Sequence, residues 1–128
     1  MKALLFPGQG VQKIGMLDEI ISSNSEIHDF LAKASEGLDF DLIKLITSGP
    51  EEKLNLTEYA QPAILASSLA IIKAKKLNSN INVTAGLSLG EYSALVYANC
   101  LKFSDALKLV NVRAVSYTHL RAHETNLD

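Results

Sequence analysis

The sequence predicts an α/β fold in which helices flank a parallel sheet, because two short strand-like stretches are separated by helical patterns. Residues 3–6 form an apolar stretch of strand length, and residues 81–85 form a second β-type stretch. The second stretch runs directly into Gly-Leu-Ser-Leu-Gly at residues 86–90, and a helical pattern follows at residues 92–98. A strand, a tight turn and a helix in immediate succession are typical of α/β folds.

The chain between the two predicted strands is helical in pattern and is divided by turn-forming residues. The predicted helices cover residues 11–22, 25–36, 40–47 and 58–76. A Ser-Ser-Asn turn separates the first two, and Ser48-Gly49-Pro50 ends the third. The fourth contains Pro62, which a helix tolerates only near its first turn.

A last helix follows, and Ser104 can cap its first turn. Arg113 lies on the edge of its apolar stripe, able to reach either solvent or a cleft. The stripe consists of Phe103, Ala106, Leu107, Val110 and Ala114. Residues 115–128 do not continue this apolar period, and we interpret them as a tail of foreign origin, similar to translated adapter or vector sequence.

The Gly-Leu-Ser-Leu-Gly segment is the strongest functional signal in the chain. A serine between two glycines at a strand-to-helix junction is the pattern of a nucleophile elbow, where the tight turn requires Gly86 and Gly90. The backbone N–H of Leu89, at the start of the next helix, can face a developing oxyanion. These features predict acyl transfer through an ester of Ser88. The alternative is a tight turn that carries an exposed serine.

A second donor for an oxyanion can come from the loop that follows the first strand. Pro7-Gly8-Gln9-Gly10 follows residues 3–6 directly, and its glycines leave the Gln9 backbone free to turn inward. From these four residues alone, a plain turn is the simpler interpretation.

Composition restricts the class of protein. The 128 residues suit one domain, and 48% hydrophobic residues are enough for a core. A net charge of −2 argues against a nucleic-acid partner. Cys100 is the only cysteine, so we expect it to be a small buried residue. We expect no signal peptide, and the apolar run at residues 62–72 is too short to span a bilayer.

Taken together, four ordered motifs resemble the N-terminal part of malonyl-CoA:acyl carrier protein transacylases of bacterial type II fatty acid synthesis. Acyltransferase domains of polyketide synthases are the related alternative. The resemblance extends from residue 1 to about residue 114. The motifs are residues 5–10 with Gln12 and Gly15-Met16, residues 57–65 around Gln61-Pro62-Ala63, residues 86–95, and Arg113.

The resemblance implies a role for five residues. Ser88 takes the malonyl group as an ester, and Leu89 and Gln9 supply the backbone N–H groups of the oxyanion hole. Arg113 holds the free malonyl carboxylate, a task suited to a planar guanidinium that is always charged. Gln61 lies near that carboxylate.

The resemblance also implies a fold. Residues 1–114 would form part of an α/β hydrolase-like large subdomain, while the ferredoxin-like small subdomain and the catalytic histidine would lie beyond residue 128. The family has a histidine before the nucleophile where this chain has Leu87, which changes local polarity but leaves the elbow glycines in place. We therefore expect residues 1–128 alone to be an inactive fragment.

None of the three histidines is a convincing base. His28 lies in a polar helical segment and is predicted to be on the surface, while His119 and His123 belong to the tail. A metal site of His119, His123 and Glu124 is possible in principle, but we predict none. Two other hypotheses remain. One is a serine hydrolase of the α/β class, which needs no arginine at position 113. The other is an inert fragment that only folds or binds.

The resemblance finally implies substrates and partners. Malonyl-CoA is the substrate, no cofactor is bound permanently, and acyl carrier protein is the partner. The complete enzyme is expected to be a cytoplasmic monomer that binds neither nucleic acid nor membrane. Lys73, Lys75 and Lys76 could dock an acidic carrier protein, but lysines at the end of a helix also complement its dipole, which we favour.

Overall fold

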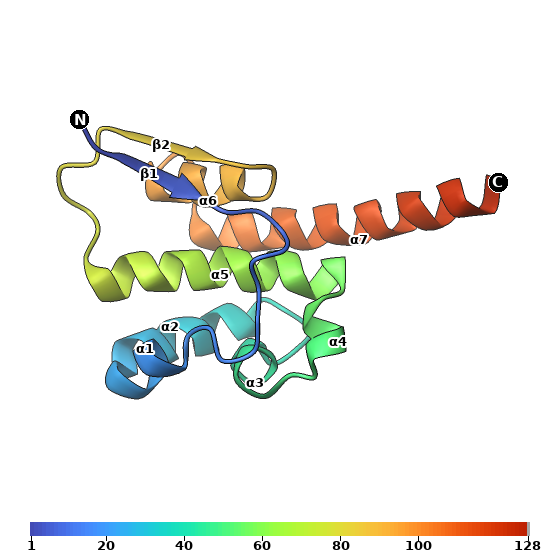
Figure 1. Cartoon of the computed structure of the whole chain (residues 1–128), viewed down its shortest axis with the longest axis horizontal. Helices are drawn as coiled ribbons and strands as arrows, with labels where there is room; N and C mark the ends of the chain where they lie inside the picture. The colour runs from blue at the N-terminus through green and yellow to red at the C-terminus, as the bar shows by residue number, and fades with distance from the viewer. Residues whose placement is uncertain (128) are drawn as a thin grey trace.

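A computed structural model describes the backbone of residues 1–127 and the side chains of residues 1–118 (Figure 1). Two strands, β1 (Ala3–Phe6) and β2 (Val83–Gly86), pair in parallel, with Ala3 opposite Val83 and Phe6 opposite Gly86. The helices are α1 (Asp18–Ser23), α2 (Ser25–Glu36), α3 (Leu42–Ser48), α4 (Glu51–Leu54), α5 (Thr57–Lys75), α6 (Gly90–Tyr97) and α7 (Phe103–Leu127). The predicted α/β class and the parallel sheet are confirmed.

Helix α5 is the centre of the fold. Its eleven consecutive residues from Ala60 to Ala70 are all buried. It packs against α2, α4, α6 and α7, so it separates the sheet and α6 from the layer of α1 to α4 (Figure 1). Pro62 lies in its second turn, and the helix begins one residue before the predicted start. The apolar stripe predicted for α7 is buried against this helix, which fixes the position of Arg113 on α7.

Side-chain caps mark the start of two of the helices before α5, namely α2 and α3. The Asn24 Oδ1 atom accepts hydrogen bonds from the backbone N–H groups of Glu26 and Ile27, at 3.1 and 3.4 Å, and α2 therefore begins at Ser25. Asp41 caps α3 in the same way, accepting from the Lys44 N–H at 3.1 Å. The short helix α4 was not predicted from the sequence.

The prediction of a helix over residues 11–22 is wrong for the first half of that range. Only α1 is helical, and residues 11–17 form a loop with turns. Gly15 has a φ angle of +83°, outside the helical range, and its N–H donates to the Ile46 carbonyl of α3 at 2.8 Å. This contact between segments attaches the loop to α3, and the local pattern does not encode it.

Two smaller expectations also differ from the structure. Cys100 is exposed, because it lies in the turn that follows α6 rather than in a packed element. Ser104 does not cap α7, because the helix has already begun at Phe103 and the Ala106 N–H donates to the Lys102 carbonyl at 2.9 Å. The backbone of α7 continues through Leu127. The origin of residues 115–128 stays a prediction.

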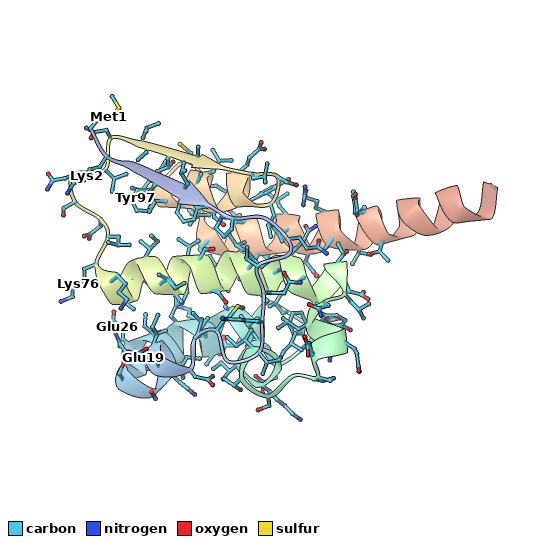
Figure 2. All side chains as sticks on the ribbon, in the orientation of Figure 1. Met1, Lys2, Glu19, Glu26, Lys76 and Tyr97 are labelled. Atoms are coloured by element: carbon cyan, nitrogen blue, oxygen red, sulfur yellow. The ribbon has the colours of Figure 1, made fainter. Side chains whose placement is uncertain are left out.

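The sheet is covered on one face by α6, while the other face carries exposed apolar side chains among the described residues. Leu5 is 74% exposed and Val83 is 49% exposed. On the covered face, Tyr97 of α6, labelled in Figure 2, packs against Phe6. The centroids of the two rings are 6.1 Å apart. Across residues 1–127, no helix is both long and apolar enough to cross a membrane.

The elbow glycines are expected to be essential for folding. A Cβ atom at Gly90 would overlap the Phe6 carbonyl, and one at Gly86 would overlap the backbone of Gly90. Because these obstacles are backbone atoms, Gly90→Ala should lower the free energy of unfolding by about 3 kcal/mol or more. Urea unfolding followed by circular dichroism measures this change. Gly37→Ala is the matched control, since its Cβ would make only an ordinary contact at 3.6 Å, and equal losses in both variants would contradict the packing argument.

Candidate active site

Ser88 lies at the tight turn between β2 and α6, as the sequence predicts. Its φ angle is +53°, in the left-handed region that costs a non-glycine residue about 1–3 kcal/mol. The turn is closed by hydrogen bonds from Gly90 N–H to the Leu87 carbonyl at 2.9 Å and from Glu91 N–H to the Ser88 carbonyl at 3.0 Å. The side chain of Leu89 is buried, whereas Ser88 is exposed. The packed turn therefore holds the hydroxyl away from the sheet.

The loop after β1 lies directly against this turn. A Cβ atom at Gly8 would be 2.7 Å from the Leu87 carbonyl oxygen, so the two segments can approach this closely only because Gly8 has no side chain. The loop is fixed at its other end, where Gly10 N–H donates to Gln12 Oε1 at 2.8 Å and Gln12 Nε2 donates to Asn55 Oδ1 at 3.1 Å.

The two backbone N–H groups predicted to form an oxyanion hole are not used elsewhere. Among the backbone of residues 1–127 and the side chains of residues 1–118, neither the N–H of Leu89 nor that of Gln9 has a hydrogen-bond acceptor. Leu89 is the residue before α6, so its N–H belongs to the partial positive end of that helix. Both donors remain available to a ligand at Ser88.

Arg113 reaches the hydroxyl from α7. Its Nη2 atom donates to Ser88 Oγ at 2.8 Å, and its Nη1 atom donates to Gln61 Oε1 at 2.7 Å. The guanidinium also lies over the Tyr92 ring, 5.7 Å from its centroid. The sequence left open whether Arg113 faces solvent or a cleft, and the structure places it in the cleft.

These contacts continue as a chain of hydrogen bonds to the start of α5. Gln61 Nε2 donates to Gln9 Oε1 at 3.4 Å, and Gln9 Nε2 donates to Thr57 Oγ1 at 3.1 Å. An arginine can only donate, so Gln61 must present its oxygen to Arg113 and its amide nitrogen to Gln9. Because the Gln9 amide oxygen accepts from Gln61, the Gln9 amide nitrogen must face Thr57. Arg113 thus sets the direction of every bond in this chain.

One cavity of about 220 Å³ contains all five residues to which the sequence assigned a role. Tyr117, which also lines this cavity, was missed because it belongs to the segment interpreted as foreign. Its position four residues after Arg113, on the same face of α7, is the signal that could have found it. The lining residues are Gly8, Gln9, Gln61, Leu87, Ser88, Leu89, Arg113 and Tyr117.

The described side chains place no general base at the hydroxyl. Arg113 cannot accept a proton, because its guanidinium stays charged. His28 is the only histidine among residues 1–118; it is half-exposed on α2, which packs against α1, α3 and α5. The side chains of His119, His123 and Glu124 lie outside the described residues. No group of three metal-ligating side chains occurs within the described part of the chain.

Comparison with known proteins assigns this arrangement to a class of acyltransferases. A family model described as acyl transferase domain matches residues 3–124, and the chain belongs to this family. Over 111 residues it is 45% identical to the malonyl CoA-acyl carrier protein transacylase of Staphylococcus aureus strain MSSA476, covering 87% of this chain and 36% of that protein. The resemblance seen in the sequence is thereby confirmed.

Comparison with solved structures gives the same family. The transacylase of Streptococcus pneumoniae, described as MCAT, superposes with a TM-score of 0.83 and 43% identity, covering 90% of this chain and 38% of that one. A malonyl-transacylase solved in complex with a type II PKS acyl-carrier protein gives a TM-score of 0.82 and 43% identity, covering 88% and 37%. The chain spans little more than a third of the length of these relatives.

Thr57 is expected to position the loop that carries Gln9. A suitable enzyme for activity tests is a chimera that joins residues 1–114 to the remaining part of the Staphylococcus aureus relative, called here the chimeric enzyme. Thr57→Val removes the acceptor for Gln9 Nε2, so kcat/KM for acyl transfer should fall about tenfold. Steady-state kinetics measures this, with equal losses expected for malonyl and acetyl donors. Thr57→Ser keeps the acceptor and should retain activity, and an unaffected valine variant would show that the bond does not position the loop.

Proposed function

We propose that this chain supplies the nucleophile and the acid-binding group of an enzyme that transfers malonyl from malonyl-CoA to acyl carrier protein in fatty acid biosynthesis. The observation that carries the proposal is the pair of hydrogen bonds from Arg113 to Ser88 Oγ and Gln61 Oε1. They place a group suited to a carboxylate beside the hydroxyl that would attack the thioester. The names of two relatives, a malonyl CoA-acyl carrier protein transacylase and a malonyl-transacylase, support the choice of malonyl.

The proposed reaction has two steps that share one ester. Ser88 Oγ attacks the thioester carbonyl of malonyl-CoA while a base takes its proton, and coenzyme A then leaves as a thiol. The N–H groups of Leu89 and Gln9 stabilise the oxyanion in both steps. In the second step, the phosphopantetheine thiol of the carrier protein attacks the ester and regenerates the hydroxyl. No permanently bound cofactor takes part.

The partner and the location of the complete enzyme are inferred from a structural relative and from the proposed substrates. One structural relative was solved with an acyl-carrier protein, which supports such a protein as the acceptor. We infer that the complete enzyme acts in the cytoplasm, because its proposed donor is a coenzyme A thioester and its proposed acceptor is the thiol of a carrier protein. That it is a monomer is inferred from the family resemblance alone.

The proposal is tested by transfer of labelled malonyl from coenzyme A to carrier protein. The chimeric enzyme should transfer the label, whereas residues 1–128 alone should not exceed a control without enzyme, since serine is a poor nucleophile without a base. A His119→Ala/His123→Ala variant of residues 1–128 completes the test. Turnover by residues 1–128 that disappears in this variant would show that those histidines supply the base. A chimeric enzyme that hydrolyses malonyl-CoA without transfer would favour the hydrolase alternative.

A further inference from the structure

A second cavity, of about 480 Å³, lies between α2, α5 and α7. Its floor is aromatic and apolar: the rings of Phe30 and Phe103 stack with centroids 4.8 Å apart, and Ala34 and Leu107 are each 4% exposed. The volume falls within the range of about 300–1,000 Å³ that is usual for small-molecule sites. Gln61 and Lys73 are twelve residues apart on α5, which separates this cavity from the Ser88 site by about 18 Å along the helix.

The rim of this cavity is positively charged. Lys33, Lys73 and Lys108 come from three different helices, and Glu36 is the one carboxylate that lines the cavity with them. All three lysines are exposed, so their ammonium groups remain hydrated and available. The Lys73 Nζ atom lies 5.3 Å from the centroid of the Phe30 ring, directly above the floor.

In the structure, Lys73 has different surroundings from the two lysines that follow it in the sequence. The sequence favours the view that Lys73, Lys75 and Lys76 only complement the helix dipole. Lys76, labelled in Figure 2, is the residue after the last turn of α5, and its φ angle is +53°. Neither Lys76 nor Lys75 lines the cavity. Of these three lysines, only Lys73 therefore lies both near the end of α5 and over the aromatic floor of the cavity.

We propose that this cavity binds an amphiphilic carboxylate, with its apolar body on the Phe30–Phe103 floor and its carboxylate held by the lysine rim. Apolar burial supplies most of the attraction, and the three ammonium groups select an anionic head over a neutral or cationic one. A partner helix fits less well, because it is about 10–12 Å wide and needs an open trough, whereas lysines from three helices surround this floor. The proposal does not depend on the activity of the Ser88 site.

The test is a titration of decanoate, kept below its micelle concentration, into 15N-labelled residues 1–128. Saturable shifts are expected in the backbone amide signals of Ala34, Gly37 and Leu107. Decanoate should bind about tenfold more tightly than decanol, and decyltrimethylammonium should not bind at these residues. Shifts confined to Leu5 and Val83 would show that decanoate binds the exposed sheet face instead, which would overturn the proposal.

Two variants test the lysine rim, and both keep the fold because the side chains they change are exposed. Lys73→Gln should weaken decanoate binding about threefold to tenfold and leave decanol binding unchanged. Lys75→Gln, on the same helical turn but outside the cavity, is the matched control and should bind decanoate as the unaltered chain does. Equal affinity for decanoate and decanol, or equal losses in both variants, would refute a lysine-held carboxylate.

Discussion

Replacing Ser88 with alanine in the chimeric enzyme will abolish the malonyl ester and lower kcat for malonyl transfer by about 10⁴-fold or more. The expected loss is large because the proposed mechanism passes through a covalent intermediate on this one oxygen. The Leu89 and Gln9 N–H groups can still polarise the thioester carbonyl, so only the weak background reaction with water should remain. Mass spectrometry of the intact protein after mixing with malonyl-CoA measures the ester directly.

Ser93 provides a matched control on the helix that follows Ser88. It lies in α6, is fully buried, and its hydroxyl has no hydrogen-bond partner among the described residues. Ser93→Ala should therefore form the ester at the unaltered rate without losing stability. A malonyl adduct that persists in Ser88→Ala would remove Ser88 from the mechanism, wherever on the chain the adduct was found.

The elements and the elbow could be predicted because their signals are local. The apolar run at residues 3–6 predicts β1 to the residue, and the Ser-Ser-Asn turn with the helical pattern after it predicts α2 over residues 25–36. The spacing of Gly86, Ser88 and Gly90 predicts a tight turn, and a Cβ atom at Gly86 would overlap the backbone of Gly90 within the same five residues. Only the requirement for Gly90 comes from a distant segment, the Phe6 carbonyl of β1.

The remaining features depend on contacts between distant segments. Thr57 is bonded to Gln9 across 48 positions, and Gly15 is fixed by the Ile46 carbonyl rather than by its neighbours. No period in the sequence reports such bonds. Tyr117 was missed for a different reason, since the apolar stripe that identifies the buried face of α7 ends before it. A residue that lines a cavity through a hydrogen bond or an exposed side chain does not add to the apolar periodicity of the sequence.

The structure also changes how Arg113 is understood. A guanidinium that binds only a carboxylate would need no partner in the free protein, yet Arg113 is bonded to both Ser88 and Gln61. A bound malonyl carboxylate would have to replace one or both of these bonds. Because the Gln61 bond continues to Gln9, the alternative role for Arg113 is to hold the loop after β1 in place. Its effects on acid selection and on loop position can be separated only by comparing two acyl donors.

Arg113→Ala in the chimeric enzyme should lower kcat/KM for malonyl transfer by about 10- to 100-fold while leaving acetyl transfer equal or improved. A charge-assisted hydrogen bond contributes about 1.5–3 kcal/mol, and of the two donors only malonyl has a free carboxylate that would lose it. Arg113→Lys keeps the charge but not the planar pair of donors, so its malonyl rate should lie between those of arginine and alanine. Kinetics with the two coenzyme A donors measures the ratio. If both rates fall equally, Arg113 holds the Gln61–Gln9–Thr57 chain in place and does not select the acid; if only the malonyl rate falls, the guanidinium binds the substrate carboxylate.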